Sequence, residues 1–505
     1  LSHEEMCVEL NNRGWSLRSP AGYSFDSTEP NVRWKSVSQQ EIFLSATKES
    51  VCLLSVLQNG EGTQTLLDPK TYLLHEDFKH MDHTPCRLPT LDQAQLSDPE
   101  KGLWELWGDD LALCKQLNLV ARDPGRDIQR RAVAIDFGTS STVVACETSN
   151  GRRELLRIGV RDFYQAVQPQ HFENPTVLEC LDFTAFQKAW TSQSYRPELD
   201  WSWMRAAHEA QASFRDNPGD TRVLASILPR LKQWALRDSE HRRVRLTDRQ
   251  SLELELPLHT ERNPLRGQAL QVNSGDPFDP IELYAWYLGM AINWRGHGLF
   301  LKYYLSFPVE YPREVRERVL ASFRRGLQRS LPQSLIEHHP GTLNEFTVEA
   351  LASEPAAYAA AALSYLNVEP TVAGVPYAVY DFGGGTTDFD FGFLRWANDA
   401  EEANGYEQVF EHLANSGDKF LGGENLIEHM AYQTFQKNLD NLREHRIQFT
   451  RPMDAGTFSG SEAFLAPTQA AQTNTVMLCA KLRPFLEIDK PDLPDQTKID
   501  LIDVN

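Results

Sequence analysis

The feature that most constrains this chain is a motif that occurs twice, at positions 132–147 and 378–391. The first copy reads AVAIDFGTSSTVVACE and the second reads AVYDFGGGTTDFDF. In each copy a short apolar run, typical of a buried strand, ends in an acid, and a second β-prone run follows a turn of small residues. The pattern predicts two strand–turn–strand hairpins. A repeat over this separation indicates two similar half-folds that face one ligand.

The residue types of the two turns suit phosphate binding. Small turn residues let main-chain N–H groups and hydroxyls approach phosphate oxygens. The acids that end the first strands, Asp136 and Asp381, can hold a hydrated Mg²⁺ against a phosphate. We therefore expect a clamp for the phosphates of a nucleotide and its metal. The alternative interpretation is that these acids only close their turns and that the glycines only make the second turn flexible.

The overall composition narrows the function classes. A length of 505 residues suggests about three domains, and a net charge of −20 argues against direct nucleic-acid binding, which needs a basic surface. The seven cysteines are scattered without a CxxC pair, which favours a reducing compartment, so we expect a cytoplasmic protein. The sequence contains no run of 18 or more apolar residues and starts without a signal-peptide pattern, so no membrane partner is expected.

One cluster of possible metal ligands occurs near the N-terminus. His75, His80, His83 and Cys86 lie close together in the sequence. Their spacing matches no standard zinc pattern, so we favour a polar surface loop over a metal site.

Local patterns predict further elements around the two hairpins. Apolar runs predict strands, periodic apolar residues predict helices, and Gly or Pro marks turns. The expected strands are 51–57, 155–160, 176–181, 300–307 and 498–504, with a hairpin turn at 59–60. The expected helices are 103–119, 201–214, 223–236, an amphipathic helix at 279–296, a helix that Pro312 opens, an Ala-rich helix at 354–366, one from Gly422 to 438, and one from 475 that ends at Pro484. A linker is expected at 121–131 and an acidic loop at 395–406.

Five segments, taken in order, resemble the ATPase domain of the 70-kDa heat-shock protein (DnaK-type) family of chaperones. They read IDFGTSSTVV, SFPVEYPREVR, SEPAAYAAAAL, DFGGGTTDFDF and GDKFLGGENL. The resemblance runs from about residue 131 to the end and implies the two-lobed α/β fold of the actin and sugar-kinase superfamily, which is ribonuclease H-like. We expect an N-terminal α+β domain of unknown role at 1–120, a linker at 121–131, a first lobe at 132–370 with a helical insertion around 183–265, and a C-terminally incomplete second lobe at 371–505.

The resemblance implies a role for each matching residue. Asp136 and Asp381 would hold Mg²⁺ through water, Glu354 would orient the attacking water, and Lys232 would neutralise the γ-phosphate. Pro308 and Arg316 look like the pair that relays the nucleotide state to the outside. The other nucleotide contacts would be Gly138, Thr139, Ser140, Gly383, Gly384, Gly385 and Thr386 at the phosphates, Gly422 and Gly423 at the sugar side, and Lys481 or Arg483 at the adenosine.

The function that this resemblance implies is slow ATP hydrolysis with Mg²⁺, in which ATP and ADP states switch the interaction with a protein partner or client. Two other functions stay open: a nucleotide-binding scaffold subunit without turnover, and a small-molecule kinase on the same fold, for which the sequence shows no sugar-kinase signature. The family's adenosine-binding Gly-Gly-x-Ser segment and its peptide-binding domain are not visible. Glu354 could also be an acid that only complements a helix dipole, and Lys232 a solvated surface residue.

Overall fold

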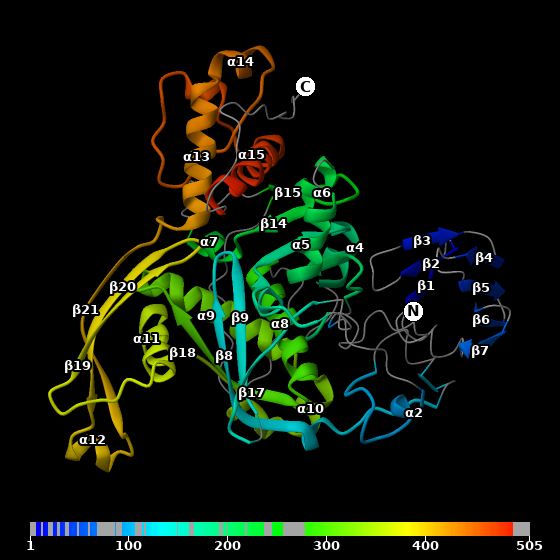
Figure 1. Ribbon diagram of the computed structural model, residues 1–505, viewed down its shortest axis with the longest axis horizontal. Coiled ribbons are helices and arrows are strands. Elements are labelled where there is room, and N and C mark those ends of the chain that lie inside the picture. Colours follow the sequence, from blue (N-terminus) through cyan, green and yellow to red (C-terminus); the bar gives the residue numbers. More distant parts are fainter. Residues whose placement is uncertain are drawn as a thin grey trace.

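The computed structural model (Figure 1) describes most of the chain after residue 92. Before that point it describes the main chain of seven strands. The described residues are these strands between Cys7 and Leu67, Cys86, and residues 93–106, 114–115, 118–148, 150–160, 166–190, 195–197, 199–217, 220–236, 245–255 and 278–487. The molecule is a mixed α/β protein.

The largest sheet has six strands and contains the first hairpin. Its strands follow the order β10, β9, β8, β17 and β18, and β11 pairs with the first residues of β9. β8 pairs with β9 antiparallel and with β17 parallel, so the hairpin is built into the middle of the sheet. The bounds are β8 (Ile128–Phe137), β9 (Ser141–Glu147), β10 (Arg153–Leu155), β11 (Asn174–Pro175), β17 (Leu299–Phe307) and β18 (Thr347–Ser353).

Helices α8 (Pro280–Arg295) and α9 (Arg313–Arg329) pack against each other and contact this sheet. The prediction that α8 is amphipathic is wrong, because its residues are buried on every side as far as Trp294. A helix can be buried all round only if its polar groups find partners. Glu282 of α8 lies 2.6 Å from both Arg325 and Arg329 of α9, which supply these partners.

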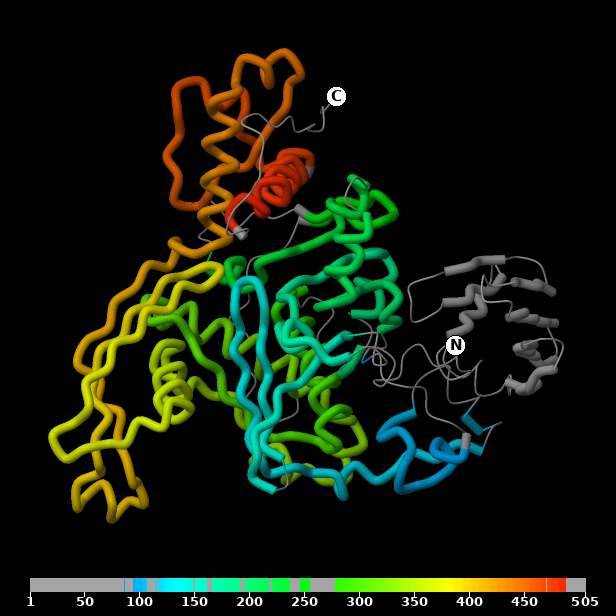
Figure 2. Tube along the Cα trace, viewed as in Figure 1, coloured from blue at the N-terminus to red at the C-terminus, as the bar shows by residue number. Residues whose placement is uncertain are grey.

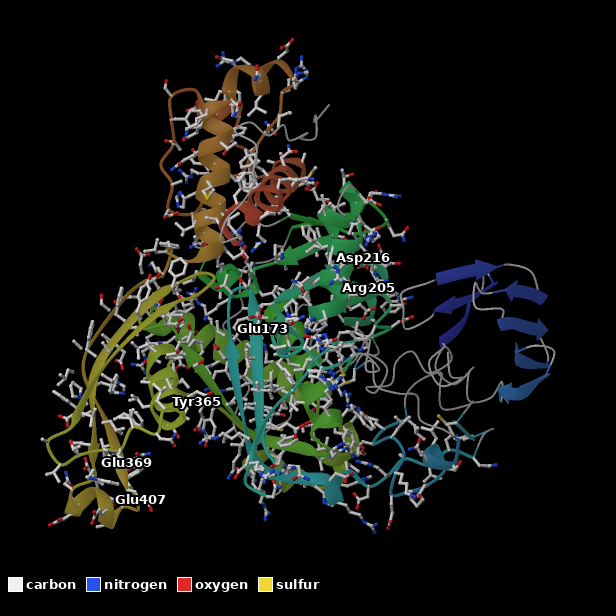
Figure 3. The ribbon with its side chains drawn as sticks, viewed as in Figure 1. Glu173, Arg205, Asp216, Tyr365, Glu369 and Glu407 are labelled. Atoms are coloured by element: carbon white, nitrogen blue, oxygen red, sulfur yellow. The ribbon has the colours of Figure 1, made fainter. Side chains whose placement is uncertain are left out.

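The second hairpin lies in a separate antiparallel sheet of three strands, in the order β19, β20, β21. Helix α11 packs against β19 and β20 and also contacts β18, so it lies between the two sheets. In Figure 3, Tyr365 at the end of α11 lies with Glu369 and Glu407 at the outer end of this sheet. The bounds are α11 (Glu354–Tyr365), β19 (Val375–Phe382), β20 (Thr387–Trp396), α12 (Asp399–Ala403) and β21 (Gln408–Asp418).

The expected helical insertion is a mixture of helices and strands. The prediction of one helix at 223–236 is wrong: Pro229 ends a short strand there, and this strand separates two helices. The helix expected at 201–214 begins only at Ala207, and the three residues before it form a short strand. The bounds are β12 (Val177–Cys180), α4 (Phe183–Trp190), β13 (Met204–Ala206), α5 (Ala207–Asp216), α6 (Thr221–Ser226), β14 (Ile227–Pro229), α7 (Leu231–Leu236), β15 (Arg245–Thr247) and β16 (Glu253–Glu255).

Three helices after the second sheet form a small hydrophobic core of their own. Within it the rings of Phe435 and Phe449 stack with their centroids 4.7 Å apart. The last of these helices starts earlier than predicted and continues past Pro484, so the expected end at this proline is wrong. The helices are α13 (Gly423–Lys437), α14 (Leu439–Glu444) and α15 (Gln469–Glu487).

Several remaining predictions concern the N-terminal part and the loops. The hairpin around positions 59–60 is confirmed, since β6 and β7 pair with Gln58 opposite Glu61. The helix at 103–119 is wrong for residues 103–106, where buried Trp104 donates to Asp127 at 2.6 Å from an irregular segment. The linker expected at 121–131 ends earlier, because β8 begins at Ile128. Of the strand expected at 155–160, only residue 155 lies in a strand. Part of the expected acidic loop forms helix α12.

The shorter elements and the N-terminal strands complete the described chain. His75, His80 and His83 and the strand expected at 498–504 lie outside the described residues. No helix of the described residues is both long and apolar enough to cross a bilayer. The remaining elements are β1 (Cys7–Asn11), β2 (Gly14–Arg18), β3 (Ser24–Ser27), β4 (Asn31–Lys35), β5 (Gln40–Thr47), β6 (Ser50–Gln58), β7 (Glu61–Leu67), α2 (Gln93–Leu96), α10 (Gln333–His338) and the 3-10 helices Pro124–Asp127, Pro169–Phe172, Pro340–Asn344 and Ser461–Ala463.

Candidate functional site

The turns of the two hairpins meet at one place in the molecule. Figures 1 and 2 show the β8–β9 turn beside the β19–β20 turn, close to α7 and to the start of α13. A side chain on Gly385 would overlap Thr139, and one on Gly384 would overlap Ser140. The two turns are therefore in contact, and this contact requires glycine on the second turn.

Several main-chain N–H groups of the two turns have no carbonyl partner among the described residues. They are the amides of Thr139, Ser140, Gly384 and Gly385, whereas the amide of Gly383 donates to the carbonyl of Thr386 at 2.9 Å. Neighbouring free amides in a turn form a concave site with positive partial charge that suits phosphate oxygens. In the first turn Gly138 is also required, because a side chain there would overlap the carbonyl of Ser141.

The two acids that end the first strands lie near each other. Asp136 and Asp381 are the last residues but one of β8 and β19. Burial, followed by the nearby charge of Asp136, raises the pKa of Asp381. The hydroxyl of Ser306 at the end of β17 donates to Asp136 at 3.2 Å. Two carboxylates at such a site attract a cation, which would relieve their mutual repulsion.

A buried ion pair lies beside these acids. Lys232 Nζ of α7 is 2.5 Å from Glu354 Oε1, and Glu354 is the first residue of α11, whose N-cap is Ser353. Lys232 is 2% exposed, so the alternative that it is a solvated surface residue is wrong. Burial raises the pKa of Glu354 to about 7, against the opposing charge of Lys232, and the charges of Asp136 and Asp388 contribute to the rise.

Asp388 is a residue of this site that the sequence analysis did not single out. It lies on β20, two residues after Thr386, and accepts a hydrogen bond from the amide of Val309 at 2.8 Å. Burial raises its pKa. The signal was present in the sequence, since Asp388 belongs to the repeated motif itself. Through Val309, the segment after Pro308 contacts the site directly. Arg316 lies on α9, where its main-chain N–H donates to the carbonyl of Pro312, and among the described residues no hydrogen bond or ion pair joins its side chain to the site.

The start of α13 is tied to the second turn. The amide of Gly423 donates to the carbonyl of Gly383 at 3.0 Å, and that of Glu424 to Gly384 at 2.7 Å. A side chain on Gly422 would come within 2.5 Å of the main chain of Gly385, so glycine is required there too. These helix amides hold the hairpin, and in this arrangement they are not free to bind a ligand.

A cluster of charged residues joins the residue before α7 to α13 and α15, above the turns in the view of Figure 1. Arg483 of α15 lies 2.7 Å from Glu424, and Arg230 lies 2.7 Å from Glu428 and 3.6 Å from Glu424. Burial alone would raise the pKa of Glu424, but the hydrogen bond from Arg483 and the charge of Arg230 outweigh it and hold this pKa below its ordinary value. Of the two residues proposed for adenosine, Arg483 thus lies at the site, whereas Lys481 is exposed on α15.

Asp136 and Asp381 are the candidate residues of this site for holding a hydrated cation. Within the described residues, no three His, Cys, Asp or Glu side chains are grouped closely enough to coordinate a metal ion directly. Mg²⁺ commonly keeps several of its waters and binds proteins through one or two carboxylates together with substrate phosphates. Asp136 and Asp381 are the residues that could hold such an ion.

Comparison with known proteins gives a distant and partial match. No protein family model matches the chain. Over 145 residues, which are 28% of this chain, it is 33% identical to the chaperone protein DnaK of Psychrobacter cryohalolentis. The chain covers 20% of that protein, so it spans about a fifth of the length of the curated relative it matches. The match suggests, at the coarse level of a distant likeness, the Hsp70-like ATP-binding chaperones.

Proposed function

We propose that this chain is an Hsp70-like protein that binds ATP and ADP between the turns of its two matching hairpins. One observation carries the proposal: the two turns touch each other and present free amides beside a buried lysine–glutamate pair. The amides of Thr139, Ser140, Gly384 and Gly385 would bind the phosphate oxygens. Mg²⁺, when bound, would neutralise phosphate charge, and Asp136 and Asp381 would hold it through water.

The site also contains the groups that ATP hydrolysis needs. Phosphoryl transfer depends on positioning and charge neutralisation more than on covalent catalysis. Glu354 would orient the attacking water, and Lys232, 2.5 Å away, would offset the charge that develops on the γ-phosphate. Because the pKa of Glu354 is about 7, its charge can change near neutral pH.

Nucleotide binding between two hairpins offers a way to couple ATP to a partner. We propose a first lobe at 132–370 and a second at 371–505, with the nucleotide between them, and a protein partner or client that senses their closure. In this arrangement α7 and α13 are in contact across the proposed boundary, since Gln233 donates to Asn425 at 2.7 Å. The partial likeness to DnaK, whose name states that it is a chaperone, supports the choice of a protein partner.

A nucleotide-binding scaffold without turnover is the second candidate. It is favoured by the close contact between Lys232 and Glu354, because each group is already the partner of the other. Such a pair could serve only to fix α7 against α11, and the nucleotide would then be a structural ligand.

The test is to measure Mg-ATP binding by calorimetry and phosphate release by a coupled assay on the same protein. We expect the wild type to bind and slowly hydrolyse ATP. Asp381→Asn removes a carboxylate that would hold the metal, and Thr139→Ala removes the hydroxyl that lies against Gly385 where the two turns meet. Each should reduce turnover by at least about tenfold. Asp399→Asn is the matched control, because Asp399 is exposed on α12, the helix that follows β20. This variant should change neither binding nor turnover. Unchanged turnover in both site variants would contradict the proposal, and binding without phosphate release would select the scaffold.

A further inference from the structure

Tyr311 is a buried tyrosine next to the Lys232–Glu354 pair. It lies between β17 and α9, where its main-chain N–H donates to the carbonyl of Pro308 at 3.3 Å. The residue is 2% exposed, and Lys232 Nζ lies 5.4 Å from the centroid of its ring. A cation at this distance from an aromatic face is attracted by it, and more strongly when both are buried. The ring therefore helps to fix the ammonium group of Lys232.

The hydroxyl of Tyr311 is buried and has no hydrogen-bond partner among the described residues. Burying a hydroxyl without a partner lowers the stability of a fold, and phenylalanine would fill the same space without that cost. Burial, with the carboxylates of Glu354 and Asp388 nearby, raises the pKa of Tyr311 well above its ordinary value, so the group keeps its proton. The Tyr311 hydroxyl is therefore a neutral O–H donor beside these two acids.

Three other donors around the acids already have one acceptor each. Each makes one short contact: Lys232 with Glu354 at 2.5 Å, the Val309 amide with Asp388 at 2.8 Å, and the Ser306 hydroxyl with Asp136 at 3.2 Å. The Tyr311 hydroxyl is thus a donor near Glu354 that is free to bind a further acceptor. An acceptor bound to the Tyr311 hydroxyl would also lie next to the Glu354 carboxylate.

We propose that Tyr311 is a positioning residue of the hydrolysis site, whose ring fixes Lys232 and whose hydroxyl donates a hydrogen bond to the water that Glu354 orients. This inference rests on the proposed function. In the step concerned, the water oxygen bonds to the γ-phosphorus while the bond from that phosphorus to the bridging oxygen breaks. The bridging oxygen keeps the electron pair and leaves as part of ADP, and the proton of the water passes to the Glu354 carboxylate.

The test compares Tyr311→Phe with the full-length wild type in three measurements. These are kcat and KM for Mg-ATP, the affinities for Mg-ADP with and without aluminium fluoride, and the midpoint of thermal unfolding. Mg-ADP with aluminium fluoride imitates the transferring phosphoryl group, so it reports on the site without turnover. Tyr303→Phe is the matched control, because Tyr303 of β17 is a fully buried tyrosine in the core, packed against Phe346.

We expect Tyr311→Phe to lower kcat by at least about tenfold, with KM and Mg-ADP affinity within about twofold of the wild type. Binding of Mg-ADP with aluminium fluoride should weaken by a similar factor, while the unfolding midpoint stays equal or rises. Tyr303→Phe should leave all the nucleotide measurements unchanged. Unchanged kcat and unchanged aluminium fluoride binding in Tyr311→Phe would overturn the inference.

The two proposals fail in different ways. A wild type that binds no nucleotide would contradict the proposed function and remove the inference with it. A wild type that binds Mg-ADP but hydrolyses no ATP would contradict hydrolysis alone, and the comparison with aluminium fluoride would still decide whether the Tyr311 hydroxyl points to the phosphoryl position. A wild type that hydrolyses ATP as fast as Tyr311→Phe would contradict only the role of Tyr311.

Discussion

At the scale of single residues, the ionisation of Glu354 has opposite consequences for activity and for stability. Its pKa is about 7 in the folded protein, against an ordinary value of 4.5, mainly because the side chain is buried. The folded state therefore binds this proton more tightly than the unfolded chain does. Stability is lost as pH rises from about 4.5 to about 7, by up to about 3 kcal/mol, and does not return at higher pH. The same rise in pH produces the carboxylate that can orient water.

We accordingly expect ATP turnover to increase between about pH 6 and about pH 8 while resistance to urea decreases over the range from about pH 5 to about pH 7. Glu354→Gln should lose most of the turnover, and its residual rate should no longer rise with pH. Its resistance to urea should lack the part of the decrease with pH that comes from Glu354. Asp381 and Asp388, whose pKa values burial also raises, add to the stability trend in both proteins. A wild-type turnover that is flat across pH 7 would exclude Glu354 as the ionising group.

At the scale of the elements, the contact between the two hairpins depends on glycine in the second turn, most of all at Gly385. A side chain on Gly385 would overlap the β-branched Thr139, which cannot easily move aside. A side chain on Gly383 would find its nearest neighbour, the carbonyl of Thr386, at an ordinary 3.4 Å. These two glycines therefore form a matched pair for an experiment.

Gly385→Ala should separate the hairpins and weaken Mg-ATP binding by at least about tenfold, which corresponds to the lower part of the usual cost of overpacking. Gly383→Ala should bind Mg-ATP about as well as the wild type. Calorimetry on both variants measures the difference. Equal affinities in the two variants would show that the phosphates do not depend on this contact.

Local pattern was enough to predict the two hairpins, because each strand–turn–strand unit is encoded within about sixteen residues. It was also enough for β17, α9 and the start of α13. It failed where neighbours in space override periodicity: α8 is buried on its polar side by two arginines of α9, and α15 continues through Pro484. Lys232 and Glu354 were each named through the family resemblance, but their contact was not predicted, since no local signal joins residues 122 positions apart. Arg230 and Glu424 were missed for the same reason.

At the scale of the whole molecule, the charged cluster above the turns decides how firmly the proposed lobes are held together. Arg230 contributes most to this contact between the proposed lobes, because it donates to Glu428 at 2.7 Å across the proposed boundary and also lies near Glu424. Arg230 is about one-fifth exposed, so water screens its interactions only in part. We expect a nucleotide bound between the turns to leave past this cluster.

Arg230→Ala should therefore speed the release of ADP by about tenfold while changing its association rate less. Stopped-flow displacement of a fluorescent ADP analogue by excess ATP measures both rates. Arg222→Ala is the control, since Arg222 is an exposed arginine whose ion pair is with Asp220 at the start of α6, and exposed ion pairs contribute little. If both arginine variants released ADP at the wild-type rate, the nucleotide would not leave through this side, and the two lobes would be held together by the hairpin contact rather than by the charged cluster.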